Sequence, residues 1–163
     1  MPGSITLLKL HRVLQVVMGW EGYHLHQYIV DGVYYGTRDP EFELPGMEME
    51  NERGVKLYQI APDVGSRFVY EYDFGDGWQH QIVVEKLLPP IAGNDGKYPR
   101  CIAGKRACPP EDVGGVWGYG DFLKVIRNPA HEDRDGMLEW AGGDFDPEEF
   151  DLEDINNALK KVR

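Results

Sequence analysis

The first apolar residues of the chain recur at the spacing of an amphipathic helix. Their separations of three, four, three and one residues keep them on one face, and the positions are Leu7, Leu10, Leu14, Val17 and Met18. Ser4 or Thr6 can cap the N-terminus of such a helix, and Gly19 can end it. The pattern therefore predicts an N-terminal helix that packs one face against a sheet or another helix.

The stretch from residue 23 to residue 35 predicts a β-hairpin. Two runs, YHLHQYIV and VYY, flank Asp31-Gly32, a dipeptide typical of two-residue turns in which both residues have positive φ. His24 and His26 lie two residues apart on the first strand, so both side chains should point to one face of it, together with Tyr28.

A second hairpin is predicted around Gly75-Asp76-Gly77, because apolar and polar residues alternate on both sides of it. A three-residue loop would pair Tyr72 with His80 and Phe74 with Trp78, and it would place the aromatic side chains on one face. We expect Tyr72, Trp78 and His80 to face the core and Asp73 to face away from His80. The aromatic residues are then core residues and not a base-stacking platform, because the charges among them are acidic.

The remaining segments alternate between loops and short helices. Residues 37–53 and 88–117 are rich in proline, glycine or glutamate, which predicts loops without regular elements. Short elements are expected at residues 55–60, 121–127 and 132–141, and after Asp151. The prediction is a single α+β domain over residues 1–163, in which a mostly antiparallel sheet of hairpins packs against an N-terminal helix and C-terminal helices.

The charge of the chain narrows the classes of partner. Its 163 residues include 17 Lys and Arg against 28 Asp and Glu, a net charge of −11, which disfavours non-specific nucleic-acid binding. No apolar run approaches the length of a membrane helix, and the N-terminus does not resemble a secretory signal. We therefore expect a cytoplasmic protein with no membrane partner. Its glutamate run, which comprises Glu41, Glu43, Glu48, Glu50 and Glu52, is interpreted as a solvated loop.

Four residues form a candidate metal site. His24 and His26 could supply two nitrogen ligands, and Cys101 and Cys108 could supply two sulfur ligands, a set that suits tetrahedral zinc. The six residues between the cysteines exceed the usual spacing of two to four. The alternative is that the cysteines are small buried residues and that the histidines form hydrogen bonds with the backbone.

A second candidate site is catalytic and lies in the second hairpin. Asp73, Asp76 and His80 could act as an acid and base group. The predicted register separates Asp73 from His80, and an aspartate at position 76 is also what a turn favours. Glu111 and Asp112 could bind a cation, but we interpret them as residues that cap a helical turn.

Four segments, in this order, resemble the plasmid pRiA4b ORF-three-like family, which is also described as a family of insertion-element passenger proteins: GWEGYHLHQYIVDGVYYG, YEYDFGDGWQH, YPRCIAGKRACPPEDVGG and DPEEFDLEDINNALK. The resemblance covers nearly the whole chain. It implies an α+β fold and an association with mobile genetic elements, and it carries over no catalytic residues. Relatives begin with an extended segment that adds a strand to the sheet, whereas Met1 to Ser4 lead almost directly into the helix here. The unpaired edge that this absence implies would favour a homodimer.

Two functions follow as hypotheses. The first is an accessory or interaction domain that binds another macromolecule, most simply a protein, and does not act as an enzyme. The second is a zinc-binding domain or metal-dependent enzyme that uses His24, His26, Cys101 and Cys108, with zinc as the cofactor.

Overall fold

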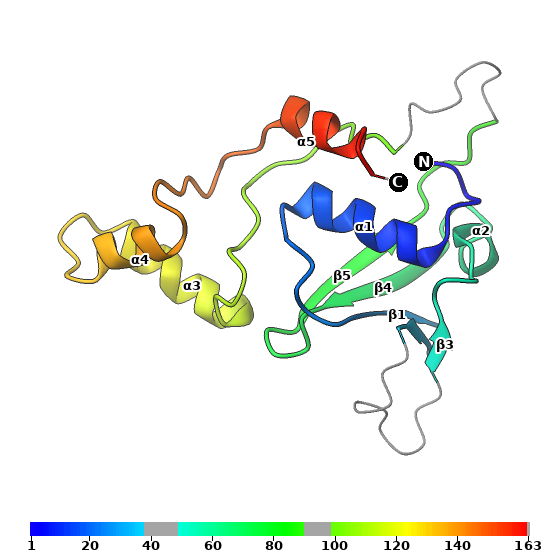
Figure 1. Ribbon diagram of the computed structural model, residues 1–163, viewed down its shortest axis with the longest axis horizontal. Helices are drawn as coiled ribbons and strands as arrows, with labels where there is room; N and C mark the ends of the chain where they lie inside the picture. The colour runs from blue at the N-terminus through cyan, green and yellow to red at the C-terminus, as the bar shows by residue number, and fades with distance from the viewer. Residues whose placement is uncertain (38–48, 90–98, 163) are drawn as a thin grey trace.

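A mostly antiparallel sheet lies at the centre of the structure, a computed structural model that describes residues 1–37, 49–89 and 99–162 (Figure 1). Within this part of the chain the sheet has five strands in the order β3-β2-β1-β4-β5. Their bounds are β1 His26–Val30, β2 Val33–Gly36, β3 Met49–Asn51, β4 Arg67–Tyr72 and β5 Trp78–Val83. Helix α1 precedes this sheet in the chain and helices follow it, which confirms the α+β prediction.

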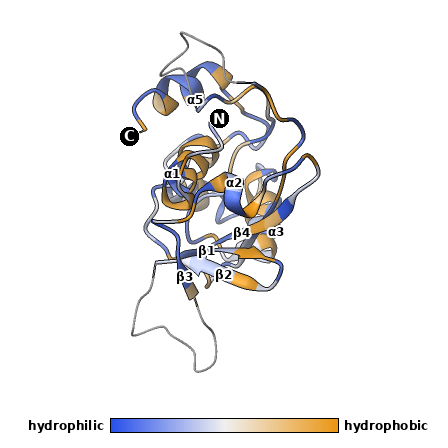
Figure 2. Cartoon of the chain, turned by 90° about the vertical axis from the view of Figure 1, so that its right-hand side faces the viewer, coloured by the Kyte–Doolittle hydropathy of each residue, from blue (hydrophilic) through white to orange (hydrophobic). Residues whose placement is uncertain are grey.

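Helix α1, Leu7–Met18, forms where the apolar pattern predicts it. The Thr6 hydroxyl accepts a hydrogen bond from the Lys9 backbone N–H at 3.2 Å, and Gly19 ends the helix in a left-handed conformation with φ 84. Leu7, Leu10 and Val13 are buried. Figure 2 shows α1 lying between the sheet and α5, Leu152–Leu159. Leu7 and Leu10 of α1 belong to the same hydrophobic core as the buried residues of the sheet.

The first hairpin also forms as predicted. Residues 27–30 of β1 pair with residues 33–36 of β2, and both turn residues, Asp31 and Gly32, have positive φ, 49 and 83. Strand β1 begins only at His26, however, so the prediction that His24 and His26 share one strand was wrong. His24 lies in a bend before the strand.

The second hairpin forms with a longer loop than predicted. Tyr72 pairs with Trp78 and Tyr70 pairs with His80, so the loop spans residues 73–77 and the predicted pairing of Tyr72 with His80 was wrong by two residues. Asp73 has φ 55, and one of its carboxylate oxygens accepts hydrogen bonds from the N–H groups of Gly75 and Asp76 at 2.9 and 3.3 Å. These bonds close the turn from the Asp73 side chain, an option that strand periodicity does not reveal.

The prediction of which side chains share a face of this hairpin remains correct, because a register shift of two residues leaves each side chain on the same side of its strand. Tyr70, Tyr72 and Trp78 are buried and His80 is half-buried, which confirms their position in the core. Phe74 does not pair with Trp78. It lies in the loop with 45% of its surface exposed, so its predicted place in the core was wrong.

Two segments that were predicted as loops contain regular structure. Met49–Asn51 forms β3, which pairs with β2 in parallel, while residues 38–48 of the same predicted loop lie outside the described part of the chain. Helix α3, Gly115–Ile126, begins six residues before the predicted Asp121. A Cβ on Gly118 would lie 2.0 Å from the Val113 carbonyl oxygen, so glycine here serves close packing and not chain flexibility.

The other helices agree with the predictions. Helix α2, Leu57–Ile60, ends before Ala61-Pro62, and α4, Arg134–Trp140, packs against α3. Asp151 caps α5 by accepting hydrogen bonds from the N–H groups of Glu153 and Asp154, both at 2.9 Å. Among the described helices, none has the length and apolar character needed to cross a membrane.

Candidate functional site

A buried polar network joins α1 to the sheet. The rings of His11 and His26 stack with centroids 3.5 Å apart and an interplanar angle of 5°. His26 Nε2 lies 2.8 Å from one carboxylate oxygen of Glu52, and the Thr37 hydroxyl donates to the other at 3.0 Å. His11 Nδ1 lies 2.8 Å from the Tyr70 hydroxyl. The network therefore connects α1, β1, β4 and the residue that follows β3.

The protonation states in this network follow from burial and its hydrogen bonds. Gln15 donates its amide to the Tyr70 hydroxyl at 2.9 Å, which leaves the hydroxyl proton for His11 Nδ1 to accept. Burial, and then the neighbouring His26, lower the pKa of His11 from 6.5 to about 4. Burial by itself would raise the pKa of Glu52, but the hydrogen bond and charge of His26 outweigh it and lower this pKa. At neutral pH, His11 is a neutral acceptor and Glu52 is an anion.

Glu52 was predicted to lie in a solvated loop, and this was wrong. Its side chain is fully buried, whereas Glu50 of the same run is exposed; Glu41, Glu43 and Glu48 lie outside the described residues. The sequence offered no signal for this difference, because the histidine that binds Glu52 comes from β1 and the threonine lies 15 residues before it.

A pocket of ≈ 540 Å³ with both apolar and polar lining lies next to the network, between α1 and residues 20–26. His11, Gln15, His24 and His26 line it, and the side-chain oxygen of Gln15 is buried there without a hydrogen-bond partner among the described residues. The pocket thus presents three imidazole rings and an unsatisfied amide oxygen on one side of α1.

His24 belongs to a cluster with three carboxylates at the edge of this pocket. Its Nε2 lies 3.3 Å from Asp112 Oδ1, 3.7 Å from Asp73 Oδ2 and 3.9 Å from Glu111 Oε2. The three acids come from two distant segments: Asp73 follows β4, and Glu111 and Asp112 precede α3. Sequence reasoning considered each of these residues but did not connect them, because the contact depends on how the loop before α3 folds onto the β4–β5 turn.

Asp76 holds these two loops together. Its carboxylate accepts a hydrogen bond from the Gly114 N–H at 3.1 Å, and a Cβ on Gly115 would lie 2.3 Å from the Asp76 carbonyl oxygen. His80 lies apart from both aspartates and places Nδ1 3.3 Å from the Tyr70 carbonyl oxygen, while burial lowers its pKa. The structure therefore places the candidate catalytic residues Asp73, Asp76 and His80 in two separate environments.

The four predicted metal ligands do not converge either. Within the described part of the chain, the group of His, Cys, Asp and Glu residues close enough to hold a metal is His24, Asp73 and Asp112. His26 binds Glu52. Cys101 lies beside α5, where its backbone N–H donates to Asn156.

Cys108 packs against the hydrophobic core. Burial, and then the nearby Glu111, raise the pKa of its thiol to about 12. This disfavours the thiolate that a zinc ligand requires.

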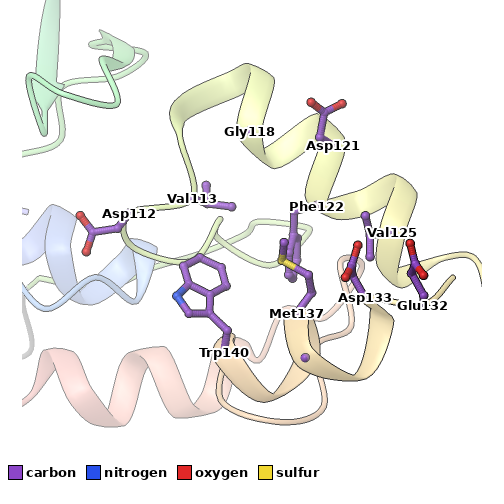
Figure 3. A pocket seen from close by; sticks show the side chains of 11 residues that line it. Asp112, Val113, Gly118, Asp121, Phe122, Val125, Glu132, Asp133, Met137 and Trp140 are labelled. Atoms are coloured by element: carbon purple, nitrogen blue, oxygen red, sulfur yellow. The ribbon is translucent and has the colours of Figure 1, made fainter.

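A second hollow, of ≈ 670 Å³, lies between α3 and α4 (Figure 3). We call it the α3–α4 groove; its apolar lining comprises Val113, Phe122, Val125, Met137 and Trp140, and its acidic lining comprises Asp112, Asp121, Glu132 and Asp133. Phe122 is buried at the floor and meets Trp140 edge-on, with ring centroids 6.1 Å apart. The groove thus has an apolar floor and an acidic rim.

Large apolar side chains beside this groove are exposed. Trp140 is 50% exposed and Met137 is 39% exposed on its α4 side. Trp117, one turn before Asp121 on α3, is 87% exposed. Sequence reasoning assigned residues 113–117 to a loop and left this surface unnoticed, because the early start of α3 decides which side chains gather there.

The chain is similar to proteins from bacteria and archaea. The plasmid pRiA4b ORF-3-like protein family matches residues 1–154. Uncharacterized protein y4hQ of Sinorhizobium fredii is 39% identical over 160 residues, which cover 97% of this chain and 79% of that protein. The crystal structure of MM3350, a protein of unknown function from Methanosarcina mazei Go1, matches with a TM-score of 0.80 at 39% sequence identity and covers 94% of this chain and 85% of that one.

Proposed function

The chain belongs to the plasmid pRiA4b ORF-3-like family, and we propose that it is a protein-binding module, not an enzyme, whose docking site is the α3–α4 groove. One observation carries the proposal: an apolar groove with an acidic rim lies beside exposed tryptophan side chains. Contiguous apolar surface of this kind is typical of interaction sites, and tryptophan is enriched among the residues that dominate binding energies.

The size of the groove suits side chains of a partner protein. A hollow of ≈ 670 Å³ is within the range that holds a compact organic group, so it can receive one or two large apolar side chains. Burying each of them contributes about 1.5 to 3 kcal/mol before the entropic costs of association are subtracted. Met137 and Trp140, already half exposed, would be covered by the same contact.

The charge of the rim defines the rest of the partner. Asp121 and Asp133 have side chains that are 74% and 67% exposed, and Asp112 is 70% exposed at the other end of the groove. Lysine or arginine residues on both sides of an apolar anchor complement this arrangement. We therefore propose a basic amphipathic segment of another protein as the occupant, with electrostatics that set specificity and the rate of association.

A selection from a random peptide library tests both parts of the proposal. The immobilised full chain is the target, and the double variant Asp121→Lys/Asp133→Lys serves for counter-selection. We expect the enriched peptides to carry Trp, Phe or Leu flanked by Lys or Arg, and to bind with Kd values on the order of 1 to 100 μM. Met137→Glu should weaken binding at least about tenfold by placing a charge against the apolar anchor, whereas Glu153→Lys on α5 is the control and should leave binding unchanged.

Three outcomes would contradict this proposal. No enrichment, or peptides that bind the double variant as tightly as the wild type, would exclude a basic partner. Light scattering that shows a dimer, converted to a monomer by Met137→Glu, would identify a second copy of this chain as the occupant. The homodimer expected from the sheet edge would instead be insensitive to Met137→Glu, because β3 and β5 form the edges of the described sheet.

The cellular setting belongs to the same proposal. The plasmid namesake of the family supports an association with mobile genetic elements. A cytoplasmic location is supported by Cys101 and Cys108, which are free thiols, as a reducing compartment would keep them.

A further inference from the structure

The cluster around His24 gathers ligands from three segments of the chain. His24 lies in the bend before β1, Asp73 follows β4, and Asp112 lies in the loop before α3. One ligand atom from each lies within 4.8 Å of the other two. The separations from His24 Nε2 are 3.3 Å to Asp112 and 3.7 Å to Asp73. Ligands at 2.0 to 2.2 Å around a tetrahedral ion would be separated by roughly 3.3 to 3.6 Å, so the two separations from His24 Nε2 are close to those around a bound ion.

The central nitrogen of this cluster has no partner. His24 Nε2 is buried from solvent and forms no hydrogen bond among the described residues, although three carboxylate oxygens surround it. A buried polar atom without a partner costs free energy. Within the described chain, the ion pairs of these three carboxylates are all with the same imidazole, His24. A divalent cation at the centre would satisfy the nitrogen and offset the excess negative charge.

Two of the carboxylates are already oriented toward His24. In Asp73, Oδ1 accepts hydrogen bonds from the Gly75 and Asp76 N–H groups, and Oδ2 is the atom that faces His24. In Glu111, Oε1 accepts from the Tyr72 hydroxyl at 3.0 Å and from the Glu21 N–H at 2.9 Å, and Oε2 faces His24. Outer hydrogen bonds of this kind fix metal ligands in place and tune their affinity.

We propose that His24, Asp73 and Asp112 bind a divalent transition-metal ion, with Zn²⁺ preferred, and that Glu111 lies close enough to contact a water molecule on that ion. A ligand set of one imidazole and carboxylates suits Zn²⁺, whereas Mg²⁺ and Ca²⁺ prefer sites made of oxygen ligands alone. Asp73 has a side chain that is only 9% exposed, and Asp112 is 70% exposed. The ion therefore enters from the Asp112 side. Of the four ligands predicted from the sequence, this site includes His24 and does not include His26, Cys101 or Cys108.

Calorimetric titration of the full chain, after dialysis against EDTA, tests the site with ZnCl₂, MnCl₂ and MgCl₂. We expect about one equivalent of Zn²⁺ to bind with a Kd of about 10 μM or tighter and no detectable Mg²⁺ binding. Asp112→Asn should weaken Zn²⁺ binding at least about tenfold without loss of folding, because its side chain is exposed. His24→Ala should do the same. His131→Ala, which removes a surface histidine 3.9 Å from Asp133, is the matched control and should bind as the wild type does.

Cobalt substitution distinguishes this ligand set from the thiol set. The Co²⁺ protein should lack a thiolate-to-cobalt charge-transfer band, and Cys101→Ser/Cys108→Ser should retain wild-type Zn²⁺ affinity. A thiolate band that the cysteine variant loses would overturn the proposal, as would an absence of Zn²⁺ binding or equal affinity in wild type, His24→Ala and Asp112→Asn. Met137→Glu should leave Zn²⁺ binding intact, so failure of the metal site and failure of the groove can be told apart.

Discussion

Acidification between pH 7 and pH 5 should destabilise the fold through His11. This imidazole accepts a hydrogen bond from Tyr70 and stacks on His26. Burial, and then the neighbouring His26, lower its pKa from 6.5 to about 4. In the unfolded chain, His11 therefore binds a proton below about pH 6.5, whereas in the folded chain it binds one only below about pH 4. Since the unfolded state binds more protons in this window, the free energy of unfolding falls as the pH falls.

The size of the effect follows from the two pKa values. A full shift from 6.5 to about 4 gives a loss of about 2 kcal/mol between pH 7 and pH 5. Water reaches part of the ring and screens its interactions, so we expect about 1 to 2 kcal/mol from His11. His80, whose pKa burial also lowers, contributes in the same direction. Most carboxylates stay ionised in this window, so the slope reports mainly on histidines.

Urea denaturation at pH 7, 6 and 5, followed by tryptophan fluorescence, measures this loss, because Trp20 and Trp78 are buried in the core. His11→Asn should be less stable than the wild type at pH 7, because it loses the stack on His26, yet its stability should fall less between pH 7 and pH 5. His131→Asn, on the surface, should keep the wild-type dependence. If His11→Asn loses as much stability as the wild type over this interval, the neutral buried imidazole is not the cause and the reasoning fails.

Three substitutions test other contacts by the free energy of unfolding, measured with urea at pH 7. Glu52→Ala should cost about 3 to 5 kcal/mol, because it leaves the His26 side chain, which is only 10% exposed, without its charged partner; a cost under about 1 kcal/mol would contradict this network. Gly118→Ala should destabilise by more than about 2 kcal/mol through the 2.0 Å approach to the Val113 carbonyl, whereas Gly136→Ala, with open space around its Cβ, is the control and should be neutral or stabilising. Asp151→Ala should cost about 0.5 to 2 kcal/mol by removing the α5 cap, and no change would show that α5 is held by its packing alone.

The sequence alone determined the elements that are marked by residues close together in the chain, such as helix caps and turn dipeptides. Helix α1 follows from the apolar spacing with Thr6 and Gly19 at its ends, and the first hairpin follows from Asp31-Gly32. The face of the second hairpin that lies in the core also follows from alternation, because a register error of two residues leaves each side chain on the same side. The four segments that resemble the plasmid pRiA4b ORF-3-like family also implied the α+β fold. In α1 and the first hairpin, the residues that mark the element, its caps and its turn, lie within a few positions of one another.

Tertiary structure decided the candidate sites, because their partners lie far apart in the sequence. Glu52 and Glu50 look alike along the chain, yet only Glu52 meets His26 and Thr37 and becomes buried. His24 meets Asp112 only because the loop before α3 folds onto the β4–β5 turn, where Gly115 lets the backbone approach Asp76. A carboxylate or imidazole has the same local propensity in solvent and in such a cluster. Its role depends on desolvation and on charges brought near by the fold, and no local pattern encodes either.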